Sequence, residues 1–317
     1  MKYRELLAWA RDFLKENDIE EPESDAWLLF EKAFDIDRAR YFLMQNEDIL
    51  QESATYDGEV RACESKAIAD CGSVPKEILN NAEVFRTFVK RRALKEPLQH
   101  ITGVQNFMGY DFKVTPDVLI PRFDTEILVE QTLKGIEELN TFSDNAVKIL
   151  DMCTGSGCIA ISLVLLAKKK GIDVKACGAD ISDKALLVAR ENADRLSCEN
   201  VHFVQSDLFE NISGERFDII VSNPPYIETN VIEELAPEVK NHEPRLALDG
   251  MADGLHFYRR IINAAGGYLS EGGRIYFEIG YNQAEAVSTL LCEAGFKDVK
   301  VIKDLAGLNR VVAAGKE

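Results

Sequence analysis

From residue 147 to the end of the chain, short apolar runs typical of β-strands alternate with longer segments of helical periodicity. A chain that alternates in this way folds into a mainly parallel, doubly wound sheet, because each strand returns to the same edge through a helix packed on one face. We therefore predict an α/β fold for this part. The expected strands are residues 148–152, 174–179, 201–205, 217–222 and 274–279, then a closing pair near Val299 and Val311.

The first 121 residues follow a different pattern, in which helical stripes precede short β-like runs. The helical stretches are residues 6–14, 26–33 and 76–94. The β-like runs are residues 107–110 and 112–114, with glycine and proline beside them as turn material. We predict a helical domain over residues 1–97, a β-hairpin linker over residues 98–121 and the α/β domain over residues 122–317.

The first predicted strand of the α/β domain runs directly into a glycine turn, Cys153-Thr154-Gly155-Ser156-Gly157, which an apolar helix follows. Such a turn lets a ligand approach bare backbone at the N-terminus of a helix. Gly-x-Gly after a strand serves NAD, FAD and S-adenosylmethionine sites alike, and it also occurs as plain turn chemistry. In this βαβ context the turn predicts ligand binding without identifying the ligand.

Acidic residues end the next two predicted strands. Asp180 is placed so that its carboxylate can accept both hydroxyl hydrogens of a ribose, although it can instead cap the helix that begins near Ser182. Asp207 is placed to accept from an adenine amino group, while Leu208 covers the ring. An aspartate in a loop is common, so Asp207 alone does not decide the ligand.

The fourth predicted strand delivers Asn223-Pro224-Pro225-Tyr226 to the carboxyl edge of the sheet, where ligands bind in this architecture. Two prolines stiffen the turn, so the Asn223 side chain and the Pro224 carbonyl can be fixed acceptors for two N–H groups of a planar amine or amide. Tyr226 would form a wall that excludes water. The structural alternative is an Asx turn ended by prolines. We predict Asn223, Pro224 and Tyr226 as catalytic, with Pro225 completing the substrate site.

The formal charge of −17, from 37 basic and 54 acidic residues, argues against direct contact with nucleic acid, because the surface repels phosphates. Residues 1–60 hold seven basic and sixteen acidic side chains, which suits either a basic protein partner or a solvated acidic face. The seven cysteines show no metal-ligand spacing, so we expect no metal. Because no apolar run is long enough for a membrane span and no signal peptide is evident, we expect a soluble, cytoplasmic protein, and a monomer.

Taken together, these motifs are similar to those of the protein N5-glutamine methyltransferases, and the resemblance covers most of the chain. The matching segments are residues 96–103, 119–126, 153–157, 222–226, 243–244 and 304–312. Three features depart from the family pattern. Cys153 stands where a glycine is usual, Phe123 stands where a proline is usual, and residues 51–74 look longer than typical.

The resemblance implies a Rossmann-like class I methyltransferase sheet with an antiparallel last strand, preceded by a small helical domain and a linking β-hairpin. It implies S-adenosylmethionine as the methyl donor. When the residues at the strand ends described above are included, the expected cofactor contacts are Cys153, Thr154, Gly155, Ser156, Gly157, Asp180, Asp207, Leu208 and Asn223. The residues from Asn223 to Tyr226 would receive a glutamine side chain. In this family the helical domain holds a class 1 peptide chain release factor, and the target is the glutamine of its Gly-Gly-Gln motif.

Other functions fit parts of the sequence. An adenine-N6 nucleic-acid methyltransferase shares an Asn/Asp-Pro-Pro-Tyr turn, but it has to hold a charged strand. A nicotinamide dehydrogenase can use Gly155, Gly157 and Asp180, which leaves the turn at Asn223 unexplained. A nucleotide-binding adaptor has no use for the acceptors at Asn223. Without the resemblance, the residues do not separate release factors from another glutamine-bearing substrate, such as a ribosomal protein.

Overall fold

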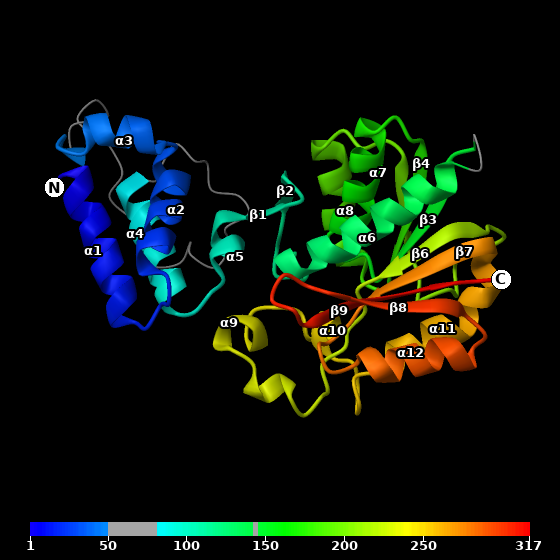
Figure 1. Ribbon diagram of the computed structural model, residues 1–317. Coiled ribbons are helices and arrows are strands. Elements are labelled where there is room, and N and C mark those ends of the chain that lie inside the picture. The colour runs from blue at the N-terminus through cyan, green and yellow to red at the C-terminus, as the bar shows by residue number, and fades with distance from the viewer. Residues whose placement is uncertain (50–80, 142–144) are drawn as a thin grey trace. The chain divides into compact units, whose positions relative to one another are not determined.

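The computed structural model describes residues 1–49, 81–141 and 145–317 of the chain (Figure 1). These residues form two compact units, Met1–Thr102 and Gly103–Glu317, and each has its own hydrophobic core. The extra segment at residues 51–74 and the predicted start of a helix at residue 76 lie outside the described residues.

The first unit is helical, as predicted. Its helices are α1 (Tyr3–Glu16), α2 (Pro22–Phe34), α3 (Arg38–Met44), α4 (Asn81–Ala93) and α5 (Leu98–Thr102). Aromatic rings fill its core: Phe30 stacks on Phe34 with ring centroids 4.5 Å apart and meets Phe85 edge-on at 5.5 Å. At the basic end of α4, Arg92 Nε lies 2.6 Å from Asp25 Oδ2, and both side chains are largely buried. The apolar stripes of the sequence therefore meet in one aromatic core.

The second unit contains a seven-stranded sheet in the order β5-β4-β3-β6-β7-β9-β8. Its strands are β3 (Val147–Met152), β4 (Val174–Asp180), β5 (Val201–Gln205), β6 (Phe217–Ser222), β7 (Leu269–Glu278), β8 (Lys297–Lys303) and β9 (Asn309–Gly315). The strands from β5 to β7 pair in parallel, whereas β9 runs antiparallel to both neighbours. The predicted mainly parallel sheet with an antiparallel last strand is confirmed.

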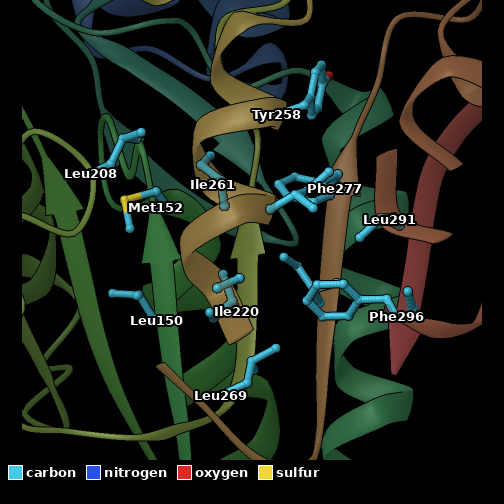
Figure 2. Packing of buried hydrophobic residues seen from close by; sticks show 14 of the residues in the cluster. Leu150, Met152, Leu208, Ile220, Tyr258, Ile261, Leu269, Phe277, Leu291 and Phe296 are labelled. Atoms are coloured by element: carbon cyan, nitrogen blue, oxygen red, sulfur yellow. The ribbon is translucent and has the colours of Figure 1, made fainter. Parts of the chain in front are cut away.

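Helices cover both faces of this sheet. On one face lie α6 (Phe123–Asn140), α7 (Cys158–Lys169) and α8 (Asp183–Arg195), and on the other lie α11 (His256–Tyr268) and α12 (Ala284–Glu293). Successive strand residues alternate between the two cores: Ile149 and Ile219 pack with α6 and α7, whereas Leu150 and Ile220 pack with α11 (Figure 2). Because both faces of the central strands are buried, β3 and β6 are nearly continuous apolar runs in the sequence.

Short elements complete this unit: η2 (Ile232–Glu234), α9 (Pro237–Lys240), α10 (Arg245–Leu248), and the hairpin of β1 (Val104–Phe107) and β2 (Tyr110–Lys113). The hairpin strands begin earlier than predicted, because Met108 and Gly109, both at positive φ, form the turn. The hairpin also packs on α8, where Asn192 Oδ1 accepts from Lys113 N at 2.7 Å. Within the described residues, no helix has the length and apolar character needed to cross a membrane.

The order of the strands reverses between β3 and β6. The chain moves outward from β3 through β4 to β5, and then returns to the other side of β3 with β6 and β7. In register, Met152 at the end of β3 lies beside Ser222 at the end of β6. Such a switch point, at the carboxyl ends of two parallel strands, is where open α/β sheets bind ligands.

Candidate active site

The glycine turn begins directly after β3, at the switch point. Cys153 and Gly155 have positive φ angles of 63° and 55°, a region that favours glycine, so Cys153 holds a strained conformation. A Cβ atom built on Gly155 would meet no heavy atom within 4 Å. Burial, with Asp180 and Asp151 close by, raises the pKa of the Cys153 thiol well above its usual range. The outer side of the turn therefore offers bare backbone at Gly155, and the Cys153 thiol beside it stays protonated.

The inner side of the turn is tied to the sheet. Thr154 Oγ1 donates to Asp151 Oδ2 at 2.6 Å, and Thr154 N donates to Ala179 O at 3.0 Å. Ser156 is buried, and its carbonyl accepts from Asn192 Nδ2 at 3.0 Å. Burial raises the pKa of Asp151 to about 7, against hydrogen bonds from Thr154 and the backbone of α7 that lower it. The Thr154 side chain and the Ser156 carbonyl thus fix the turn from within, whereas Cys153 and Gly155 stay partly exposed.

Asp180 joins the end of β4 to the glycine turn. Its Oδ2 accepts from Gly155 N and its Oδ1 accepts from Ser182 N, both at 2.9 Å. Burial raises the pKa of Asp180, and the backbone donors lower it. The N-cap of α8 is Ser182, whose Oγ accepts from Ala185 N at 3.2 Å, so Asp180 is not that cap. Each Asp180 oxygen keeps a lone pair, which suits two hydroxyl groups.

Asp207 and Leu208 follow β5 at the same edge of the sheet. Arg260 of α11 holds the Asp207 carboxylate, with Nη1 at 2.9 Å from Oδ1. Leu208 has a positive φ of 52°, unusual for a branched side chain, and packs in the core with Met152 and Phe209 (Figure 2). The structure therefore brings Asp207 to the edge, and it turns most of the Leu208 side chain into the core.

The Asn223-Pro224-Pro225-Tyr226 turn follows β6. Ser222 Oγ donates to Met152 O at 2.6 Å and ties this turn to the start of the glycine turn. Pro224 is buried, whereas Asn223 and Tyr226 are half-buried. Burial raises the pKa of the Tyr226 hydroxyl above its usual range, so this group stays neutral. The two turns that carry the predicted site lie side by side at the switch point.

A glycine-containing segment packs against the back of the Asn223–Tyr226 turn. A Cβ atom on Gly250 would lie 2.8 Å from Tyr226 Cα, and one on Gly254 would lie 2.4 Å from Tyr226 O. Gln283 Nε2 donates to Tyr226 O at 2.9 Å and to Gly254 O at 3.3 Å. Any side chain at Gly250 or Gly254 would therefore displace the turn.

Two residues that the sequence reasoning missed reach Asn223. Asn223 Nδ2 donates to Thr125 Oγ1 of α6 at 3.3 Å. The Glu278 carboxyl group, at the end of β7, is 1% exposed and lies near enough to Thr125 and Asn223 for both side chains to lower its pKa, and its Oε2 has no hydrogen-bond partner within the described residues. Burial raises its pKa to about 7, although Thr125, Arg310 and Asn223 oppose this rise. The only sequence signal for Glu278 is its position as a single acidic residue at the end of an apolar strand. The same pattern is also typical of a solvent-exposed strand end.

Ion pairs connect the segments around this edge. Arg310 Nη2 lies 3.0 Å from Asp304 Oδ2 and 3.0 Å from Asp124 Oδ2, and so links the loop before β9 to the start of α6. Arg122 pairs with Glu243, whose side chain is almost completely buried. Both pairs fall in segments that carried the resemblance noted from the sequence. They tie the start of α6 to the loop before β9 and to the segment before α10.

These groups suit a nucleoside ligand beside a planar amide. The open backbone at Gly155 admits a ligand, Asp180 keeps lone pairs for a ribose, and Asp207 is held by Arg260 with one oxygen left to accept. Among the described side chains, no group of three His, Cys, Asp or Glu residues is arranged to hold a metal ion.

A sheet of this order, with both turns meeting at its switch point, has the architecture expected of a class I methyltransferase. Two family models match it, Methyltransferase small domain over residues 133–241 and PrmC N-terminal domain over residues 5–57. The release factor glutamine methyltransferase of Geobacter sulfurreducens is 38% identical over 98% of this chain and 95% of its own length. That of Clostridium acetobutylicum is 37% identical over 99% and 98%. The chain belongs to the family of release factor glutamine methyltransferases.

A solved structure supports the fold alone. The catalytic domain of hMettl16, solved in complex with the MAT2A 3'UTR hairpin 6, matches with a TM-score of 0.51 and 17% identity. The match covers 70% of this chain and 80% of that one.

Proposed function

We propose that this protein transfers a methyl group from S-adenosylmethionine to the side-chain amide nitrogen, N5, of the glutamine in the Gly-Gly-Gln motif of class 1 peptide chain release factors. The observation that supports this most is the adjacency of the glycine turn and the Asn223 turn, tied by the hydrogen bond from Ser222 Oγ to Met152 O. The close match to relatives over nearly their whole length supports the same substrate.

For the cofactor, we assign the backbone from Cys153 to Gly157, together with Asp180, Asp207 and Leu208. When bound, S-adenosylmethionine supplies an electrophilic methyl group on its sulfonium sulfur. Asp180 would accept from the ribose hydroxyls, because both of its oxygens are already fixed by backbone donors at 2.9 Å. Asp207 would accept from the adenine amino group, and the exposed edge of Leu208 would contact the ring.

For the substrate, we assign Asn223, Pro224, Pro225 and Tyr226. An amide nitrogen is a weak nucleophile, because its lone pair is delocalised into the carbonyl group. Asn223 Oδ1 and the Pro224 carbonyl would accept its two hydrogens, which orients the nitrogen and favours charge build-up on it. No strong base is needed first, because the nitrogen becomes acidic once it is methylated. Tyr226, neutral and half-buried, would exclude water.

For the partner, we assign the helical unit to docking of the release factor. The proposed division is a helical docking domain over residues 1–97, a hairpin linker over residues 98–121 and a methyltransferase domain over residues 122–317. A separate unit with its own core can present a docking surface without disturbing the site. The acidic excess over residues 1–60 suits a basic surface on the partner. We also infer a cytoplasmic monomer.

Labelled methyl transfer tests this function. Purified class 1 release factor should accept the label, and the same factor with alanine in place of the Gly-Gly-Gln glutamine should not. Purified ribosomal proteins serve as a parallel arm, because they distinguish another glutamine-bearing substrate. Label in both forms of the factor, or in neither, would reject the substrate. Calorimetry with S-adenosylmethionine and with NADH tests the cofactor independently.

A further inference from the structure

We propose that Glu278 is a positioning residue that sets the rotation of the Asn223 side-chain amide, so that Asn223 Oδ1 is the atom presented to the substrate nitrogen. The inference rests on the proposed function, in which Asn223 is a hydrogen-bond acceptor. Glu278 acts through Asn223 and Thr125 rather than by touching the substrate.

The sheet itself delivers these side chains to one place. Ser222 pairs with Phe277 in the parallel register of β6 and β7, so the next residues along the two strands, Asn223 and Glu278, are neighbours, and Glu278 still pairs with Val311 of β9. Tyr258 Oη donates to Glu278 O at 2.8 Å, and Ile279 N donates to Arg310 O at 2.9 Å. The backbone on both sides of the Glu278 carbonyl is therefore fixed, and the side chain has little freedom to leave Asn223.

The chemistry of the two groups determines their mutual orientation. A side-chain amide has nearly the same shape after rotation by half a turn, so packing alone does not choose between its oxygen and its nitrogen. An ionised carboxylate can only accept hydrogen bonds. Glu278 therefore selects the NH₂ side of Asn223, and Thr125 Oγ1 accepts from the same nitrogen at 3.3 Å. With Nδ2 held on this side, Oδ1 points away from Glu278 and remains an acceptor.

The selection depends on the charge of Glu278. The groups that act on its carboxyl from neighbouring elements are Thr125 and Asp124 of α6, Arg310 of β9 and Asn223 after β6; Tyr226, Tyr258 and Cys158 also sense its charge. Burial outweighs the influence of Thr125, Arg310 and Asn223, which lower the pKa, and raises the pKa of Glu278 to about 7. Once protonated, the carboxyl group becomes a donor as well as an acceptor, and it no longer excludes the Asn223 oxygen.

The first test observes the amide directly and needs no turnover. In ¹⁵N-labelled full-length protein, the side-chain NH₂ signals of Asn223, assigned by their loss in Asn223→Ala, should shift with an apparent pKa near 7. In Glu278→Gln these signals should be insensitive to pH, whereas in Glu271→Gln they should titrate as in wild type. Glu271 is a matched control because it is an exposed glutamate of the same strand. If the chemical shifts of the Asn223 NH₂ group changed neither with pH nor in Glu278→Gln, the proposal would be overturned, whatever the substrate.

The second test measures catalysis. Because glutamine can face Asn223 with either end of its own amide, Glu278→Gln should lower kcat by about 10- to 100-fold, the range expected for a misaligned nucleophile. KM for the release factor and Kd for S-adenosylmethionine should stay near wild type, and Glu271→Gln should be fully active. Wild-type kcat should fall as the pH drops below 7. This acid limb of the pH–rate profile should be absent from Glu278→Gln. Asp151, whose pKa is also raised to about 7, would keep the limb in the variant if it were the source.

Thr125→Val gives a second, isosteric variant in case Glu278→Gln does not fold. It removes one acceptor for Asn223 Nδ2 but leaves the carboxylate, so kcat should fall less than in Glu278→Gln and the acid limb should remain. A folded Glu278→Gln protein with wild-type kcat and an unchanged acid limb would overturn the positioning role. No methyl transfer by wild type, together with the expected amide titration, would instead reject the proposed substrate alone.

Discussion

Asn223 uses the two ends of its amide differently. Its nitrogen donates to Thr125 and, in our proposal, is oriented by Glu278, and its oxygen is the proposed acceptor for the substrate. Asn223→Ala should lower kcat by about 10² to 10³, because a preorganised contact to the reacting group is lost. The cost to folding should be roughly 1 to 3 kcal/mol, because the buried Glu278 carboxylate loses a donor.

The rate of Asn223→Ala is measured at saturating S-adenosylmethionine, so that any loss of cofactor affinity does not distort kcat. Asn106→Ala, which changes an exposed asparagine of the β1–β2 hairpin, is the matched control and should have wild-type kcat. A folded, saturated Asn223→Ala protein that methylates at the wild-type rate would make the turn purely structural.

The sequence could predict those site residues that follow a strand directly. Asp180 and Asn223 each end a readable apolar run, and parallel strands bring such ends to one edge. Thr125 and Glu278 could not be found in this way. Thr125 lies 98 residues from Asn223 along the chain, and the contact depends on where α6 packs. The proximity of Glu278 to Asn223 can be recognised only when the register of β6 and β7 is known.

Among the elements, the segment that contains Gly254 is most sensitive to a single added atom. In Gly254→Ala, the Cβ would fall 2.4 Å from Tyr226 O, at a φ of 68° that disfavours alanine. We expect a loss of roughly 1 to 3 kcal/mol in stability and a fall in kcat, because the Asn223–Tyr226 turn must move.

Gly267→Ala is the control for this variant. Gly267 lies in α11 with nothing within 4 Å of its Cβ position, and alanine favours a helix, so stability should stay equal or rise. Urea unfolding and kcat measured on the three proteins check the prediction. Equal kcat for Gly254→Ala and wild type would show that the turn tolerates displacement.

The bounds of a strand could be predicted from the sequence where polar residues stand on both sides of an apolar run. β5 and β6 begin and end as predicted, because their apolar runs are bounded by polar residues. β7 begins at Leu269 rather than at Arg274, since Leu269 pairs with Phe217 across a register shift. From the sequence, Gly272 and Gly273 between these residues predict a turn that would interrupt the strand. Only the partner strand shows that the strand continues through them.

For the whole molecule, division into two units predicts separable functions. A protein of residues 103–317 keeps the complete sheet, its two cores and every proposed cofactor contact. It should bind S-adenosylmethionine with an affinity close to that of the full chain. Its kcat/KM for whole release factor should fall by about tenfold or more, because a docking contact of 1.4 kcal/mol is worth tenfold. Calorimetry and labelled transfer check the two parts, and equal kcat/KM for both forms would refute the docking role.

Buried acids should also make stability depend on pH. Burial raises the pKa of Glu278 to about 7, so the folded protein retains a proton that the unfolded chain releases near its ordinary pKa. This group therefore lowers stability progressively as the pH rises from about 4.5 to 7, and the loss is complete above that window. Glu278→Gln should be more stable than wild type by roughly 1 to 3 kcal/mol at pH 8.5, and the difference should be much smaller at pH 5.

Urea unfolding of both proteins at the two pH values checks this. If the free energies of unfolding of the two proteins differed by the same amount at pH 5 and pH 8.5, burial of an ionised carboxylate would be contradicted. The combination of higher stability with lower turnover would identify Glu278 as a residue retained for activity rather than for folding.

The cysteine of the glycine turn has a consequence for the chemical reactivity of the protein. Thiolates, rather than thiols, react with alkylating and oxidising agents, and the raised pKa keeps Cys153 in the thiol form. Cys158, Cys177 and Cys198 are buried, whereas Cys292 on α12 is exposed. Among the cysteines of the described residues, a maleimide dye would therefore attach at Cys292, on the outside of a helix. The proposed site therefore contains a thiol that should react slowly with such a dye, whereas an exposed helix of the same unit can be labelled.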